Sequence, residues 1–135
     1  MKIKQMIVSP GRTGFYFDDY KAIRDGGAKA DGANYVGTPM TAGFSHVRQA
    51  GESISIQFIL EDGQIAWGDC AAVQYSGAGG RDPLFLASEF IPILEKEVAP
   101  HFVDREITTF REMAVEVEKM KHDGKPLHTA LRYGL

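Results

Sequence analysis

A strict alternation of apolar and polar residues between positions 53 and 60 places the strongest constraint on the fold of this chain. The apolar residues of this stretch are Ile54, Ile56, Phe58 and Leu60. Because successive side chains of a strand point to opposite faces, the pattern predicts a strand with one buried face. The sequence Glu61-Asp62-Gly63 follows, and Asp-Gly tolerates the positive φ angles of a tight hairpin turn. We therefore expect residues 64–72 to return as the paired strand.

The second half of the chain is predicted to be helical. Between residues 84 and 98, apolar residues recur at helical spacing, and Pro92 lies inside this stripe as a kink or a restart. Asp82 and Pro83 are the expected N-cap and first helical residue, because an aspartate accepts hydrogen bonds from free N–H groups and a proline needs no partner. A helix is therefore expected to begin directly after Asp82.

A capping pattern and a second apolar stripe predict the next helix. Thr109 and Glu112 have the spacing of a capping box, and apolar residues follow Phe110 at i+3, i+4, i+7 and i+10. This helix should end near residues 122–124. A last stripe begins at Leu127, and the sequence stops before anything evident covers its apolar face, which suggests a domain cut from a longer protein.

The amino-terminal third has weaker patterns. Residues 3–8 are predicted to form a strand that Ser9-Pro10-Gly11 ends. Glycine-containing turns break residues 11–51 into short pieces, where we expect small hairpins or a functional flap. Strands followed by helices indicate the α+β class, with a three-stranded antiparallel meander followed by a small helical bundle.

Composition argues against several classes of function. The 15 basic residues are scattered and the net charge is −3, so neither nucleic acid nor a membrane surface is an expected partner. A single cysteine, Cys70, rules out an internal disulfide and a cysteine-based zinc cluster. No apolar run suits a signal peptide or approaches the ~20 residues of a membrane helix. A soluble protein of the cytoplasm is expected.

The residues that often carry chemistry form no catalytic or metal-binding set in the sequence. Four histidines, far apart in the chain, are expected at the surface or at helix ends: His46, His101, His122 and His128. Asp18 and Asp19 are interpreted as a solvated loop pair, because adjacent residues of a strand point to opposite faces. Cys70 is expected to be a buried, inert thiol, and Trp67 is expected in the core.

A glycine-rich segment from Val73 to Arg81 separates the predicted hairpin from the helices. It lacks the Gly-Lys-Ser/Thr sequence of a Walker loop, and Asp82 stands where a dinucleotide fingerprint needs its third glycine. Three interpretations remain open: a phosphate site, a plain tight turn, and a loop that closes over a ligand. The last is favoured, because glycines let the backbone approach a ligand closely.

The same region resembles the methylaspartate ammonia-lyase family. The longest matching stretch runs from Gly68 to Phe85, and further stretches at residues 13–19, 49–55 and 127–134 match in the order of the family. The resemblance implies the capping domain of an enolase-superfamily protein over residues 1–135. A (β/α)8 barrel would follow it, and this chain lacks that barrel.

The resemblance also implies an activity. The family eliminates ammonia from threo-3-methylaspartate to give mesaconate, a step of glutamate fermentation, with Mg²⁺ bound by the barrel. All catalytic groups would lie in the barrel, so this chain is expected to be inactive alone. Its expected partners are its own barrel, the amino-acid substrate and a second copy in a homodimer. The alternative is a stand-alone binding or interaction module that retains the lid fold.

The resemblance places the substrate contacts of this chain in the glycine-rich segment. Gln74 is the first candidate, because its amide both donates and accepts hydrogen bonds near an amino or carboxylate group. Tyr75 and Ser76 are secondary candidates. The remaining residues assigned to the lid loop are Val73, Gly77, Gly79 and Gly80.

Overall fold

The computed structural model describes residues 1–72 and 82–135, which group into two compact units. The sheet–helix unit comprises Met1–Gly11, Ser53–Ala71 and Leu86–Leu135. The hairpin unit comprises Arg12–Glu52 and the described part of Ala72–Phe85. Two long strands contribute residues to both units.

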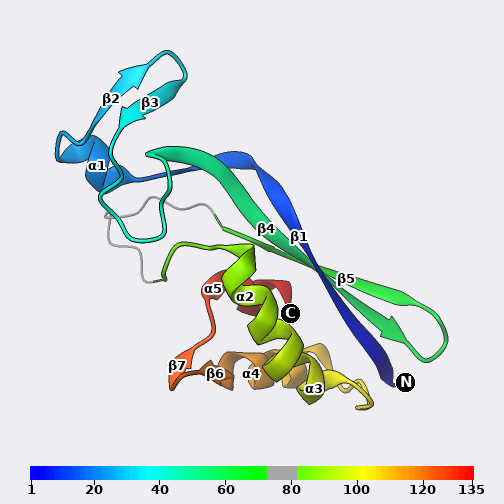
Figure 1. The fold of residues 1–135 in the computed structure, drawn as a ribbon. Helices are drawn as coiled ribbons and strands as arrows, with labels where there is room; N and C mark the ends of the chain where they lie inside the picture. The colour runs from blue at the N-terminus through cyan, green and yellow to red at the C-terminus, as the bar shows by residue number, and fades with distance from the viewer. Residues whose placement is uncertain (73–81) are drawn as a thin grey trace. The chain divides into compact units, whose positions relative to one another are not determined.

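Three strands form the main sheet in the order β1-β4-β5 (Figure 1). They are β1 (Ile3–Asp18), β4 (Arg48–Leu60) and β5 (Ile65–Ala71). β4 pairs antiparallel with β5, so that Ile54 lies opposite Cys70 and Phe58 lies opposite Ala66. Gly63 in the turn between them has a φ of 85°. The predicted hairpin and its turn are therefore confirmed.

β1 continues past the point where the sequence predicted its end. The strand runs through Ser9-Pro10-Gly11 to Asp18, so the predicted stop is wrong. Pro10 is tolerated because β1 is an edge strand, where a missing N–H need not break a ladder. Gly11 marks a close approach between strands, since a Cβ on Gly11 would lie 2.7 Å from the Ser53 hydroxyl oxygen.

The hairpin unit contains a short helix and a small two-stranded sheet. These elements are α1 (Tyr20–Arg24), β2 (Ala28–Asp31) and β3 (Asn34–Gly37). β2 and β3 pair antiparallel with Asp31 opposite Asn34, and Gly32 in the turn has a φ of 59°. The small hairpin expected between residues 11 and 51 is confirmed.

The first helical segment starts later than predicted. It consists of α2 (Ala87–Ile93), the π-helical turn η1 (Leu94–Val98) and α3 (Ala99–Phe102). Its N-cap is Leu86, with an extended backbone and no side-chain cap, so the assignment of Asp82 as the cap is wrong. Residues 83–86 before the helix have no regular secondary structure, and Phe85 among them is fully buried. Pro92 stays inside α2, and the turn after it widens to the π form.

The second helix begins where its sequence pattern predicts, but it ends at Lys119 rather than near residues 122–124, because residues 121–126 form a small hairpin. α4 (Phe110–Lys119) begins with a complete capping box. The Thr109 hydroxyl accepts from the Glu112 N–H at 3.3 Å, and the Glu112 carboxylate accepts from the Thr109 N–H at 3.1 Å. The next elements are β6 (Lys121–His122), β7 (Lys125–Pro126) and α5 (Thr129–Gly134).

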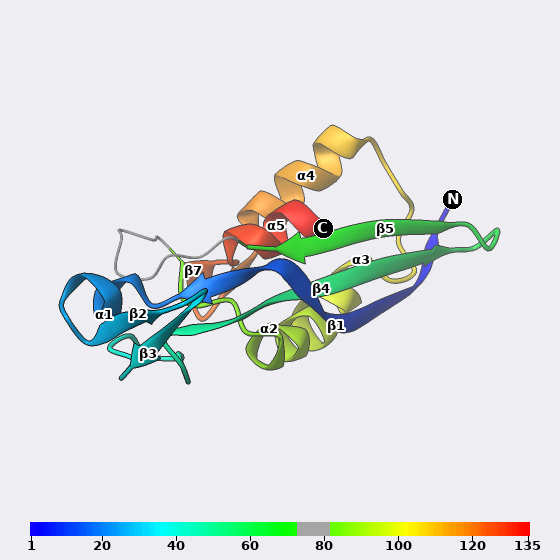
Figure 2. The same ribbon diagram turned by 90° about the horizontal axis from the view of Figure 1, so that it is seen from above.

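The helices α2 to α5 gather against one face of the sheet (Figures 1 and 2). The buried strand residues of that face include Ile54, Ile56, Phe58 and Cys70. Buried residues from the helices include Leu94, Phe102, Val117 and Leu131. The rings of Phe58 and Phe102 meet edge to face at 5.5 Å. This single layer of helices on a sheet confirms the α+β class.

Two expectations about apolar residues are wrong. Trp67 is 68% exposed, because it pairs with Gln57 on the sheet face opposite to Phe58. The last apolar stripe is covered, since α5 packs on β5 and buries Leu127 and Leu131. Among the residues that the structure describes, no helix has both the length and the hydropathy to cross a bilayer.

Candidate functional site

The candidate substrate contacts lie outside the described residues. This applies to Gln74, Tyr75 and Ser76. It applies equally to the other lid-loop positions, Val73, Gly77, Gly79 and Gly80. The structure describes the two flanks of the segment, namely the end of β5 and the residues from Asp82 onward. The assignment of these residues to substrate contact therefore stays a prediction.

The β5 flank is held by a close backbone contact with α5. A Cβ on Gly68 would overlap the carbonyl oxygen of Gly134, so the two glycines pack backbone to backbone. Cys70 is fully buried beside Gly134. Burial, together with the nearby Asp69 carboxylate, raises the pKa of the Cys70 thiol to about 12. The predicted inert thiol is confirmed, and this flank provides rigid support rather than a nucleophile.

His128 caps the amino terminus of α5 and is buried. Its Nδ1 accepts a hydrogen bond from the Ala130 N–H at 3.0 Å, so this nitrogen carries no proton. The imidazole ring meets the Phe90 ring edge to face, with 5.1 Å between the centroids. The histidines were expected at the surface or at helix ends, and His128 lies at a helix end.

Two other histidines lie close to carboxylates at the surface of the sheet–helix unit. His101 Nε2 lies 3.0 Å from a Glu116 carboxylate oxygen, and His122 Nδ1 lies 2.8 Å from Glu97 Oε1. Arg105 donates two hydrogen bonds to Glu116, at 2.7 and 3.1 Å, and these hold the pKa of Glu116 down to about 2. Across residues 1–72 and 82–135, no three His, Cys, Asp or Glu side chains form a group that could hold a metal ion.

Asp18 and Asp19 are buried, so their interpretation as a solvated pair is wrong. Asp18 accepts two hydrogen bonds from the Arg48 guanidinium, at 2.7 and 2.8 Å. The same guanidinium lies over the rings of Tyr16 and Tyr35, 5.2 and 4.8 Å from their centroids. The hydrogen bonds to Asp18 raise the pKa of Arg48. This cluster fastens the end of β1 to the start of β4 within the hairpin unit.

Asp19 organises the chain that follows β3. Its Oδ2 accepts from the N–H groups of Met40 and Thr41, at 2.6 and 2.8 Å. Its Oδ1 accepts from the Thr41 hydroxyl at 2.7 Å and caps α1 through the Ala22 N–H at 3.3 Å. Asp18 is the last residue of β1 and Asp19 is the N-cap of α1, and the two carboxylates bond to different partners. No local sequence pattern indicates these contacts, because Arg48 lies 30 positions from Asp18 and Met40 lies 21 positions from Asp19.

Within each unit, the buried polar groups of the described residues therefore serve structural contacts. Within the described ranges, every buried side-chain nitrogen or oxygen has a hydrogen-bond partner. The two buried carboxylates are bonded to an arginine and to backbone N–H groups, and the buried thiol keeps its proton. These contacts position the backbone.

Known proteins resemble this chain along its whole length. A family model described as "Methylaspartate ammonia-lyase N-terminus" matches residues 1–135. Methylaspartate ammonia-lyase of Clostridium tetanomorphum is 62% identical over 135 residues, which cover 100% of this chain and 32% of the relative. The Mg complex of β-methylaspartase from that organism gives a TM-score of 0.94 at 62% identity, covering 99% of this chain and 32% of the other. The Citrobacter amalonaticus enzyme containing (2S,3S)-3-methylaspartic acid gives 0.92 at 55% identity, with the same coverage. The chain thus spans about a third of the length of these relatives.

Proposed function

The chain belongs to the methylaspartate ammonia-lyase family as an amino-terminal domain, and we propose that it is the lid over the active site of a longer enzyme. That enzyme eliminates ammonia from threo-3-methylaspartate to give mesaconate. The strongest support is the family match over all of residues 1–135, together with the TM-score of 0.94 to a solved relative. Because the chain spans only 32% of that relative, the groups that perform the elimination are proposed to lie in the rest of the protein.

Magnesium is proposed to act in the longer enzyme, since one relative was solved as a Mg complex. The described residues of this chain do not fit a magnesium site. Mg²⁺ prefers oxygen ligands, above all carboxylates. The buried carboxylates of Asp18 and Asp19 are already bonded to Arg48 and to backbone N–H groups. The proposed ligands therefore belong to the (β/α)8 barrel of an enolase-superfamily enzyme, beyond the residues of this chain.

The glycine-rich segment 73–81 is proposed to be the part of the lid that meets the substrate. Its β5 flank is supported by the contact between Gly68 and Gly134. Glycines next to a rigid support let the backbone approach a small ligand and exclude water from it. Gln74 is proposed to contact the amino or carboxylate group of the substrate, with Tyr75 and Ser76 as secondary contacts.

The assembly and cellular role follow from the same proposal. A homodimer of the longer enzyme, a cytoplasmic location and a role in glutamate degradation are supported by family membership alone. The alternative of a stand-alone binding module is not favoured, because the relatives that match the whole chain are named ammonia-lyases.

Replacement of Gln74 with alanine in the longer enzyme is the experiment that tests this proposal. We expect kcat/KM for methylaspartate to fall about tenfold or more while the melting temperature stays unchanged, because a lost substrate contact weakens positioning rather than folding. Gln64→Ala is the matched control, since Gln64 is an exposed glutamine of the β4–β5 turn. Both variants are assayed by the absorbance of mesaconate.

Two results would count against the proposal in different ways. Equal kinetics for Gln74→Ala and Gln64→Ala would remove Gln74 from the substrate site. Absence of methylaspartate turnover by the unsubstituted longer protein would reject the lyase function itself.

A further inference from the structure

The amino-terminal cap of α5 is a histidine, and its hydrogen bond depends on the protonation state of the ring. The usual cap residues Ser, Thr, Asp and Asn keep an acceptor oxygen at neutral and mildly acidic pH. Here the acceptor is His128 Nδ1, which takes the Ala130 N–H at 3.0 Å. A proton on Nδ1 would turn this nitrogen into a donor and break the bond. The cap therefore holds only while the imidazole is neutral.

The surroundings of His128 favour the neutral ring. Its residue is 6% exposed, and its ring meets Phe90, which supplies no hydrogen-bond acceptor for a second proton. Charging a buried group costs free energy unless an opposite charge lies beside it. A positive charge is also unfavourable next to the free N–H groups that begin a helix.

The acidic residues of α2 and β5 are directed away from His128. Glu89, the only charged residue of α2, is exposed while its neighbour Phe90 is buried. Asp69, the only charged residue of β5, lies on the sheet face opposite to α5 and accepts from the Ser55 hydroxyl at 3.4 Å. Neither carboxylate is placed to balance a charge on His128.

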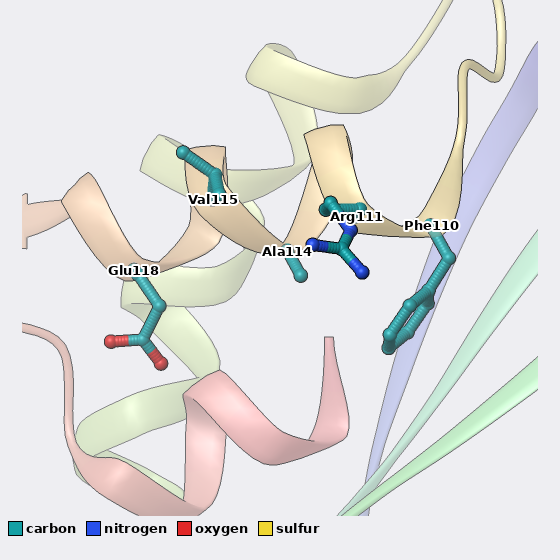
Figure 3. A pocket seen from close by; sticks show the side chains of 5 residues that line it. All are labelled: Phe110, Arg111, Ala114, Val115 and Glu118. Atoms are coloured by element: carbon teal, nitrogen blue, oxygen red, sulfur yellow. The ribbon is translucent and has the colours of Figure 1, made fainter.

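The nearest charges on α5 and α4 form a pair with each other. Arg132 donates to the Leu127 carbonyl oxygen at 3.1 Å and to the Thr129 hydroxyl at 3.2 Å, so its guanidinium lies beside the start of α5. The Glu118 side chain of α4 extends toward α5 and pairs with this guanidinium (Figure 3). The pair is neutral as a whole and supplies no free carboxylate to a charged His128.

The other acids of the neighbouring elements are few. On α4, Glu112 belongs to the capping box and Glu116 bonds to Arg105. In the sequence, residues 73–81 contain one charged residue, Arg81, and no acid, and residues 82–86 contain one acid, Asp82. Asp82 is therefore included in the experiment below.

The cap matters because α5 covers β5. With six residues, α5 is too short to be a stable helix by itself, so its cap and its packing act together. Gly134 packs against Gly68 and Cys70, and Leu131 is fully buried. Loss of the cap at the start of the helix therefore weakens its contact with β5.

We infer that His128 is a pH-sensitive latch, which holds α5 on β5 while its ring is neutral and releases α5 when Nδ1 gains a proton. The open state takes up this proton at about pH 6.5, as an unperturbed histidine does, whereas the closed state excludes it. The open population therefore rises as the pH falls below that value, by up to about tenfold per pH unit. The inference goes beyond the proposed function, because it concerns the support of β5 and not the elimination.

Hydrogen exchange of the α5 amides in the longer protein measures the latch. The exchange rate of residues 127–135 is divided at each pH by that of the same free peptide, because intrinsic exchange also varies with pH. Protection should be constant above about pH 7 and should fall by up to about tenfold per pH unit below about pH 6.5. His128→Asn and His128→Ser should remove this dependence, because both keep an acceptor oxygen at the cap throughout this range.

His46→Asn and Asp82→Asn are the matched controls. His46 is an exposed histidine of the hairpin unit, and Asp82 is the acid that precedes α2. Both variants should keep the pH dependence of α5. Reaction of Cys70 with dithiodipyridine, a thiol reagent that works in acid, gives a second measurement relative to a free cysteine peptide. The thiol should become more reactive as the pH falls, but not in the two His128 variants.

Three results would overturn the inference. They are protection of α5 that does not change with pH, a pH dependence that persists in both His128 variants or is lost in Asp82→Asn, and the failure of both His128 variants to protect α5 at the alkaline end of the range. Neither measurement uses turnover. The latch and the proposed lyase function can therefore fail separately.

Discussion

Replacement of Asp19 with alanine is expected to destabilise the hairpin unit by about 3–5 kcal/mol. The carboxylate is fully buried and accepts hydrogen bonds from the N–H groups of Ala22, Met40 and Thr41, and from the Thr41 hydroxyl. Alanine removes all of these acceptors and leaves the backbone donors near residue 40 without this partner. The cost is large because four hydrogen bonds to one buried carboxylate are lost together, and three of them are part-buried, so that water replaces them only in part.

Urea unfolding measures this loss, and hydrogen exchange at the Met40 and Thr41 amides locates it. Asp31→Ala is the control, since Asp31 is an exposed residue of β2, and its replacement should change stability by no more than about 0.5 kcal/mol. Asp19→Asn should fall between the two, because its amide keeps one acceptor oxygen. Equal stability of the Asp19→Ala and Asp31→Ala variants would show that the carboxylate does not organise this loop.

Replacement of Gly68 with alanine is expected to destabilise the sheet–helix unit by about 3 kcal/mol or more. The added methyl group would overlap the carbonyl oxygen of Gly134, and neither backbone can move aside as the end of a flexible side chain would. Relief of the overlap requires α5 to separate from β5, which would expose Leu131 and Cys70.

Gly14→Ala provides the matched control, because no atom lies within 4 Å of a Cβ at that position. Thermal unfolding should show a large drop in melting temperature for Gly68→Ala and almost none for Gly14→Ala. Alkylation of Cys70 gives a second measurement, since the thiol is shielded only while α5 stays in place. A Gly68→Ala protein with unchanged melting temperature and a shielded Cys70 would contradict the packing described for these two elements.

The elements that the sequence predicted well are those whose patterns are local. The alternation from Ile54 to Leu60 and the turn at Gly63 specify the β4–β5 hairpin within one short stretch. The capping box at Thr109 and Glu112 likewise specifies the start of α4, because both partners lie within one helical turn. The order of strands before helices indicated the α+β class, and the resemblance to a known family implied the same class.

Features that depend on distant partners could not be predicted from local patterns. The strand β1 passes through Pro10 because it is an edge strand, which only the sheet order reveals. Trp67 is a large apolar side chain of the kind expected in a core, yet its pairing with Gln57 places it on the exposed face of the sheet, opposite to Phe58. Asp18 was expected to be solvated, because its partner Arg48 lies 30 residues away in the sequence.

In the candidate site, too, features with a local sequence pattern could be predicted and features that depend on distant residues could not. The inert character of Cys70 followed from its neighbours in β5, and the structure confirms it. The support of the glycine-rich segment by Gly68 and Gly134 had no sequence pattern, because the two glycines meet only after α5 folds onto β5. Substrate contact by Gln74 rests on family resemblance and amide chemistry, and it stays a prediction.

We propose that this chain forms a cover over the active site, while groups elsewhere in the longer enzyme perform the elimination. The most direct measurement compares mesaconate formation from methylaspartate and Mg²⁺ by the purified 135-residue chain and by the longer protein, at equal molar concentration. Turnover by the longer protein and none by the 135-residue chain is the expected result. Sustained turnover by the 135-residue chain alone would contradict the claim.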